Sequence, residues 1–316
     1  MSHELEMVNG QASMAWAGET PWHGLGKQVP ADLTPIQMLE AAGLDWEVKK
    51  VKVRAEYKRK PIVGLNIHAL VRTSDNKFLT SVSDTWNPCQ NLEAFEFFND
   101  FVSTGDMEMH TAGSLHGGRM VWALAKVSDS FELFGGDKVE GYLLFSNPHQ
   151  FGKSIDIRFT PVRVVCNNTI SLALNLESKH GIRINHRKKF DGDEVKLTLG
   201  IAHEQLQRYK EKAEFLGTRR YTNENVVDYF KRIFPVQSKT KEISRNAELC
   251  MEILETQPGA EFAEGTFWQL HNAVTFVTNH LQGRSADNRV ESMWYGANKD
   301  RNLQSLDLAV EMANAA

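Results

Sequence analysis

Cysteine is scarce in this sequence and is not arranged as a metal site or a disulfide framework. The three cysteines, Cys89, Cys166 and Cys250, are odd in number and far apart, and no Cys-x-x-Cys occurs. Structural zinc sites and disulfide-rich folds need closely spaced cysteine pairs. Their absence favours a reducing compartment, and we expect the protein to be cytoplasmic.

Long apolar runs and an excess of positive charge are also lacking. No run of about 18 apolar residues occurs, so the sequence predicts no membrane span. The first residues include acids and no continuous apolar stretch, so we expect no signal peptide. The net charge is −4, so any binding to nucleic acid has to come from local basic patches.

Common enzyme motifs are missing as well. His203-Glu204 begins like a zinc-protease helix, but Gln207 stands where the second histidine belongs. The glycine-rich stretch 112–119 lacks the Lys-Ser/Thr ending of a P-loop, and its serine is not in a Gly-x-Ser-x-Gly turn. We therefore predict no metal and no cofactor. The sequence favours a protein that is not an enzyme but leaves the question open, because active sites assemble from distant residues.

What the sequence does contain is a series of strand patterns in its first part. Alternating charged and apolar residues over 49–60 predict an exposed strand with one basic face. Ser74-Asp75-Asn76, between two apolar runs, predicts a hairpin over 65–82. Further strands are expected over 120–127, 141–146 and 154–165, and Gly117-Gly118 is expected to be a turn joining two strands.

Capping residues and a helical spacing of apolar residues predict the helices. Thr34, Pro35 and Gln37 form a capping box that starts a short helix, which Gly43 ends. Helical spacing recurs over 91–102, 193–217, 223–234, 242–255, 265–281 and 302–314. Strands first and helices after predict an α+β fold. We expect a mostly antiparallel sheet domain with a few packed helices over 1–190 and a helical region over 191–316.

Two basic segments, 49–60 and 183–189, are candidates for contact with nucleic acid. Lysine runs are often only solvated surface, but two such segments near an aromatic residue also fit a groove for a single strand. Phosphates would be bound by the cations and bases by the aromatic faces. The predicted contact residues are Lys49, Lys50, Lys52, Arg54, Tyr57, Lys58, Arg59, Lys60, Arg187, Lys188 and Lys189.

A second candidate site surrounds the stretch TPVRVVCNNT, residues 160–169. Arg163 interrupts an apolar run, and a buried guanidinium must be paired, either with an internal carboxylate or with a bound anion. The residues after it are N-cap candidates for a short helix, whose free amides favour anions. The predicted anion or ligand site comprises Trp22, His23, Arg119, Arg163, Asn167, Asn168 and Thr169.

Several of these stretches together resemble a known family. PWHGLG, WNPCQNLEAFEFF, TAGSLHGGRMVWALAKV, TPVRVVCNNTISLAL and GTFWQLHNAVTFVTNH resemble the phage/plasmid-like protein family, a domain-of-unknown-function family of phages, prophages, plasmids and bacterial genomes. The resemblance covers nearly the whole chain, with Trp86 standing in place of a tyrosine-like residue. It implies a mobile element and the cytoplasm of a bacterial host, but no catalytic residue can be carried over.

Three functions remain as hypotheses. The first is binding of nucleic acid, with single-stranded DNA expected, in recombination or replication. Phage single-strand annealing proteins have a comparable layout, so by analogy we also expect a homo-oligomer. The second is an enzyme or binder acting on a nucleotide or other phosphorylated small molecule at the Arg163 site. The third is a phage factor that binds a host protein.

Overall fold

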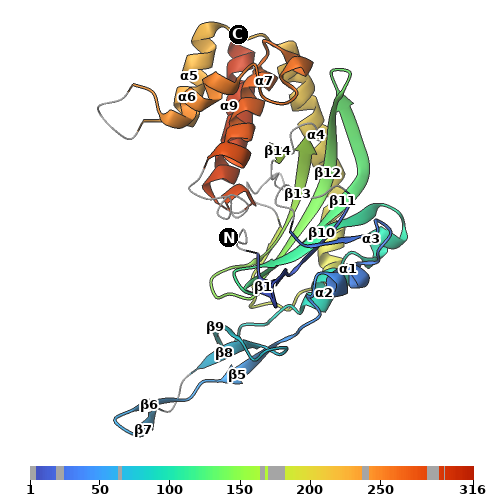
Figure 1. Ribbon diagram of the computed structural model, residues 1–316, viewed down its shortest axis with the longest axis vertical. Helices are drawn as coiled ribbons and strands as arrows, with labels where there is room; N and C mark the ends of the chain where they lie inside the picture. The colour runs from blue at the N-terminus through green and yellow to red at the C-terminus, as the bar shows by residue number, and fades with distance from the viewer. Residues whose placement is uncertain are drawn as a thin grey trace. The chain divides into compact units, whose positions relative to one another are not determined.

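The computed structural model describes residues 5–18, 25–62, 66–163, 168–169, 182–236, 242–282, 292–294 and 296–316 (Figure 1). The predicted α+β class is confirmed, because antiparallel strands dominate the first part of the chain and helices dominate after residue 191. The chain forms two compact units. Unit 1 is Met1–Ser128, Leu143–Arg158 and Leu174–Gly200, and unit 2 is Asp129–Tyr142, Phe159–Ala173 and Ile201–Ala316.

The largest sheet contains the three long strands that the sequence predicted. Its strand order is β14-β13-β12-β11-β10-β3-β4, with β15 also paired to β13. Strands β3 and β4 are parallel, whereas β10 pairs antiparallel with both β3 and β11. The bounds are β3 Met14–Ala17, β4 Lys27–Val29, β10 Met107–Leu115, β11 Met120–Leu133, β12 Asp137–Pro148, β13 Ile155–Arg163, β14 Asn168–Thr169 and β15 Ile182–Ile184.

A smaller sheet and a two-stranded ribbon make up residues 48–83, which we call the arm. Strands β5 (Val48–Lys52), β8 (Ile67–Arg72) and β9 (Phe78–Ser83) form the sheet, and β6 (Ala55–Tyr57) pairs with β7 (Lys60–Ile62) in the ribbon. The hairpin predicted around Ser74-Asp75-Asn76 is confirmed as β8–β9. The single strand predicted over 49–60 is wrong, because the chain reverses at Lys58-Arg59.

Unit 1 also holds a second tight hairpin and three short helices. The hairpin joins β1 (Met7–Val8) to β2 (Gln11–Ala12). Helix α1 (Pro35–Ala41) has the predicted capping box, since the Thr34 and Gln37 side chains accept from each other's backbone N–H. The helix expected over 91–102 is split into α2 (Asn91–Glu96) and α3 (Asn99–Ser103).

Two buried aromatic residues lie at the split between α2 and α3. Phe97 and Phe98 are adjacent in sequence, and both are buried. Their rings lie 5.1 Å apart and each approaches Phe145. The two residues that separate α2 from α3 therefore both contribute their rings to the core of unit 1.

The predicted helices of the C-terminal part are confirmed. They are α4 (Gly192–Thr218), α5 (Asn223–Ile233), α6 (Arg245–Ile253), α7 (Phe267–Phe276) and α9 (Ala297–Ala315), with a 3-10 turn at Ala260–Ala263 and a π turn at Val277–Leu281. Within unit 2 the buried Trp268 donates from Nε1 to Asp137 Oδ2 at 3.1 Å. Tyr229 on α5 and His271 on α7 both meet the Ser305 hydroxyl of α9, at 2.6 and 2.9 Å.

Candidate nucleic-acid interface

Positive charge is concentrated in the arm. Residues 48–83 contain nine lysines and arginines and only two acids, a net charge of +7, whereas the whole chain carries −4. The remaining residues therefore sum to −11. A localised cationic segment on an acidic protein is what binding to phosphates at one place requires.

The lysines and arginines of the arm differ in whether another group of the protein holds their side chains. Lys50 donates from Nζ to the Asp84 carbonyl oxygen at 2.7 Å, and Lys49 lies 3.6 Å from the Glu47 carboxylate. Five other cations are exposed and form no ion pair with any residue that the structure describes. They are Lys52, Arg54, Lys58, Arg59 and Lys60. These five are the most available to an external phosphate.

The turn between β6 and β7 has an unusual backbone. Lys58 and Arg59 both have positive φ, 49° and 63°, and they are the only two residues between Tyr57 and its partner Lys60. Two positive φ values in a two-residue loop define a type I′ hairpin, which strongly prefers Asn-Gly. A residue with a side chain in this left-handed region costs about 1–2 kcal/mol.

The same chain builds another turn of this kind from the preferred residues. Between β1 and β2, Asn9 and Gly10 have φ values of 51° and 82°. Asn-Gly is thus used at one hairpin and Lys-Arg at the other, although the backbone requirement is alike. Backbone geometry alone does not explain the cations at the β6–β7 turn, and strained positions of this sort gather at functional sites.

Tyr57 stands beside this turn as an exposed aromatic residue. Its side chain is 66% exposed, and Lys58 Nζ lies 5.3 Å from its ring centre. Tyr57 pairs with Lys60, and Ala55 pairs with Ile62, so these four residues share one face of the ribbon. An aromatic ring next to three cations is the combination that stacks a base while binding its phosphate.

The second predicted basic segment is held next to the end of the arm. Asn87, four residues after β9, donates from its backbone N–H to the His186 carbonyl at 2.6 Å and from its side chain to the Arg187 carbonyl at 3.1 Å. His186 Nδ1 lies 2.9 Å from the Asn87 carbonyl oxygen. The structure thereby brings exposed Arg187, Lys188 and Lys189 into the neighbourhood of the arm.

Trp86, which precedes the Asn87 contact, does not offer a surface for stacking on a base. It is 5% exposed and its ring is stacked on His186 at 4.1 Å between centroids. Burial lowers the pKa of His186, so the imidazole is held neutral against the indole. Trp86 therefore joins two segments of unit 1 rather than meeting a ligand.

The glycine turn at 117–118 is already occupied by cations of the arm. A Cβ at Gly117 would lie 2.5 Å from Lys77 Nζ, and one at Gly118 would lie 2.8 Å from Arg72 Nη1. Both cations are paired with the buried Glu6 carboxylate, at 3.5 and 2.6 Å. Arg119 is exposed, and its Nε donates to the His116 carbonyl at 3.2 Å.

This network, in which Arg72 and Glu6 are buried, holds the base of the arm. The bidentate hydrogen bond to Asp75, the Glu6 contact and both negative charges raise the Arg72 pKa above its ordinary value. The Arg72 hydrogen bond in turn lowers the pKa of Asp75 to about 2. Ser114 completes the set by donating to Glu6 at 3.0 Å. Because its charges are mutually neutralised, the network is structural rather than an anion site.

The anion site predicted around Arg163 stays a prediction. The backbones of Val162 and Arg163 pair with Thr169 and Asn168 in β13–β14. The side chains of Arg163, Asn168 and Thr169, and all of Trp22, His23 and Asn167, lie outside the described residues. The expected helix after Thr169 also lies outside them.

The cation that β13 does bury is one that sequence analysis missed. Arg158 is almost fully buried and makes a bidentate pair with Asp156, Nη2 to Oδ2 at 2.6 Å. Arg183 Nε joins from β15 at 3.2 Å. Residues two apart in a strand share a face, so the pattern Asp-x-Arg inside an apolar run was the available signal.

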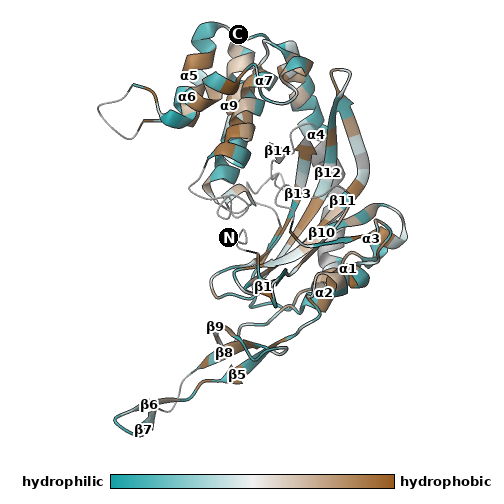
Figure 2. Ribbon diagram, in the orientation of Figure 1, coloured by the Kyte–Doolittle hydropathy of each residue, from teal (hydrophilic) through white to brown (hydrophobic). Residues whose placement is uncertain are grey.

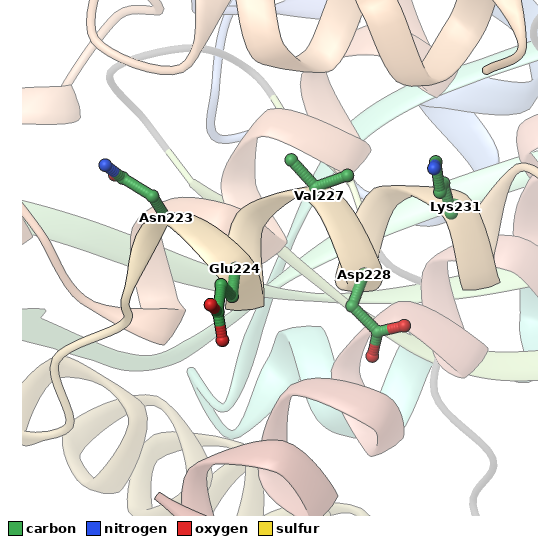
Figure 3. Close-up of a pocket in the computed structure, with 5 residues that line it drawn as sticks. All are labelled: Asn223, Glu224, Val227, Asp228 and Lys231. Carbon is green, nitrogen blue, oxygen red and sulfur yellow. The ribbon is translucent and has the colours of Figure 1, made fainter. Parts of the chain in front are cut away.

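Two surface hollows among the described residues contain no residue of either predicted site. One lies along α5 alone, where Figure 3 shows its lining side chains Asn223, Glu224, Val227, Asp228 and Lys231 on a single helix. Another is lined by Glu93, Glu96, Phe97, Phe190 and Gly192. Acidic groups line both hollows, which does not suit a phosphate. Within the described ranges no cluster of His, Cys, Asp or Glu could hold a metal ion.

Among the residues that the structure describes, no helix is long and apolar enough to cross a membrane.

Comparison with family models finds one match, to "Domain of unknown function (DUF932)", over residues 78–294. The match begins at the first residue of β9, so β5 to β8 precede it. No curated protein and no solved structure matches the chain.

Proposed function

The chain belongs to the DUF932 family, and we propose that it is a phage or mobile-element protein that binds single-stranded nucleic acid through the arm. Phosphates contact the unpaired cations Lys52, Arg54, Lys58, Arg59 and Lys60, with Arg187, Lys188 and Lys189 extending the basic surface. Tyr57 stacks on a base. Single-stranded DNA is the expected ligand, in recombination or replication in the host cytoplasm.

The observation that carries the proposal is the Lys58-Arg59 turn. Two exposed cations occupy positions where Asn-Gly forms the same hairpin without strain, as at Asn9-Gly10. Keeping them costs about 1–2 kcal/mol per residue. A role in contacting an anionic ligand explains why this cost is tolerated.

The decisive variant transfers the Asn-Gly turn to the arm as Lys58→Asn/Arg59→Gly. Each phosphate contact to a single strand contributes about 0.7 to the salt slope, so we expect the slope to fall by about 1.4. Fluorescence anisotropy with labelled single-stranded and duplex oligonucleotides, from low to high salt, measures it. Thermal unfolding should show a melting temperature no lower than that of the wild type.

Two matched variants keep this test specific. Lys58→Arg/Arg59→Lys preserves the charges and should keep the salt slope. Lys50→Ala removes a lysine that is already bound to the Asp84 carbonyl and should change the slope less than Lys52→Ala does. An Asn-Gly variant with undiminished affinity and slope would contradict the proposal.

A further inference from the structure

The arm sheet has two faces that differ sharply, and the strand register identifies them. Val71 pairs with both Lys49 and Phe78, and Ala69 pairs with both Val51 and Ser81. Paired residues, and residues two apart along a strand, lie on the same face. Val51, Ile67, Ala69, Val71 and Phe78 therefore share one side, which we call the open face.

The opposite side is the covered one. Val48, Leu70, Arg72 and Val82 lie on it, and all four are buried within unit 1. An ordinary antiparallel sheet of this kind is apolar on its covered face and polar on its solvated face. Here the solvated face combines five apolar residues with Lys49, Ser81 and Ser83.

Three residues of the open face are strongly exposed, and Ala69 and Val71 are half-buried between them. Phe78 is 58% exposed, Val51 49% and Ile67 45%. Figure 2 shows hydrophobic colouring on β5 and β8, whereas the β6–β7 ribbon is mostly hydrophilic. Single exposed apolar residues are common, but a contiguous group on one face marks an interaction surface.

The charge around the open face indicates which kind of molecule binds to it. Lys49 lies in the same row as Val71 and Phe78, and the arm as a whole carries +7. Packing of this face against the same face of a second copy would bring together two arms of the same charge, which repel each other. Unpaired nucleobases combine apolar faces with a polyanionic backbone, and a duplex hides those faces inside its stack.

We propose that the open face is a platform for unpaired bases and that it gives the arm its preference for single strands over duplexes. This inference rests on the proposed function, because it assigns phosphate contact and base contact to two different parts of the arm. The turn and the free lysines contact phosphates, which both kinds of nucleic acid offer. Phe78 and its apolar neighbours contact bases, as Tyr57 of the ribbon does, and only a single strand offers unpaired bases.

The test is Phe78→Ala, with Phe151→Ala as its matched control. Phe151 is 62% exposed and lies in the turn between β12 and β13, outside the arm. Loss of one base contact should weaken single-strand binding about tenfold in anisotropy titrations. Duplex affinity and the salt slope should stay unchanged, and Phe151→Ala should bind like the wild type.

Phe78→Trp supplies a direct readout, since its added indole should be quenched by single-stranded oligonucleotides and not by duplexes. If Phe78→Ala binds single strands like the wild type, or loses single strands and duplexes equally, the base platform is refuted while the phosphate-contacting arm stands. A wild-type protein that binds no nucleic acid even at low salt refutes the proposed function itself. If Phe78→Ala instead turns an oligomer into a monomer in sedimentation velocity and leaves binding intact, the open face is a self-association surface.

Discussion

At the scale of single residues, burial separates the polar side chains that hold the fold together from those that are available to bind a ligand. Asn91 and His149 lie fully buried in unit 1, with Asn91 Oδ1 2.8 Å from His149 Nε2. Asn91 also donates to the carbonyl oxygens of Leu44 and Trp46, at 2.9 and 3.3 Å. These groups join the start of α2 to the loop before β5 and to the residue that follows β12. Among the residues that the structure describes, none holds Lys52, Arg54, Lys58, Arg59 or Lys60 in this way.

The buried His149 makes unfolding sensitive to acid. Burial, with a smaller contribution from His186, lowers the pKa of His149 to about 3. Below pH 6.5 the unfolded chain binds a proton that the folded chain does not, so stability falls as the pH falls from about 6.5 towards 3. At pH 5 the loss is about 2 kcal/mol relative to neutral pH.

Urea unfolding of the wild type and of His149→Gln at pH 7 and pH 5 measures this effect. The variant should lose about 2 kcal/mol less than the wild type between the two pH values, whatever its absolute stability. Equal losses in both proteins would mean that His149 is protonated in the folded state.

At the scale of elements, a few polar contacts within the apolar core determine the register of β-strands and the rotation of helices. In β13 the Arg158–Asp156 pair lies within the core of unit 1, and Arg183 of β15 reaches the same carboxylate. In unit 2 the Ser305 hydroxyl of α9 meets both Tyr229 and His271. Such contacts select one register or one helix rotation among several that bury similar apolar area.

The Arg158–Asp156 pair should be costly to break from one side. Arg158→Met leaves a buried carboxylate with only the partly exposed Arg183 beside it, and we expect a loss of about 3–5 kcal/mol. Asp156→Asn/Arg158→Met removes both charges and should recover most of that loss. Denaturant unfolding of the two single variants and the double variant completes the cycle, and a purely additive double variant would contradict the pairing.

At the scale of the whole molecule, the pairing of β5 with β8 in the arm sheet does not depend on the β6–β7 ribbon between them. Lys52 of β5 pairs with His68 of β8, so Val53 and Ile67 are the next residues on adjacent antiparallel strands. A two-residue turn suffices to join such strands. Residues 54–66 can therefore be replaced by Asn-Gly with the arm sheet retained.

This shortened chain should fold like the wild type and bind single strands poorly. It lacks Arg54, Lys58, Arg59 and Lys60, so the salt slope should fall by about 2.8. Circular dichroism and thermal unfolding check the fold, and anisotropy titration checks the binding. Full affinity in a folded shortened chain would move the interface away from the ribbon.

The amino-acid sequence by itself determined the features that depend on neighbouring residues. The capping box of α1, the hairpin at Ser74–Asn76 and the helices after residue 191 all follow from caps, turn residues and hydrophobic period. The Asn9-Gly10 hairpin was readable in the same way but was overlooked. The basic character of 49–60 was equally visible.

Only the tertiary structure decided the features that depend on partners far along the chain. The reversal at Lys58-Arg59 contains none of the residues that usually form such a turn, and the break between α2 and α3 falls at two rings that approach Phe145. The meeting of Asn87 with His186 joins segments about a hundred residues apart. A local pattern records what a residue prefers, whereas burial and pairing depend on which distant segment arrives beside it.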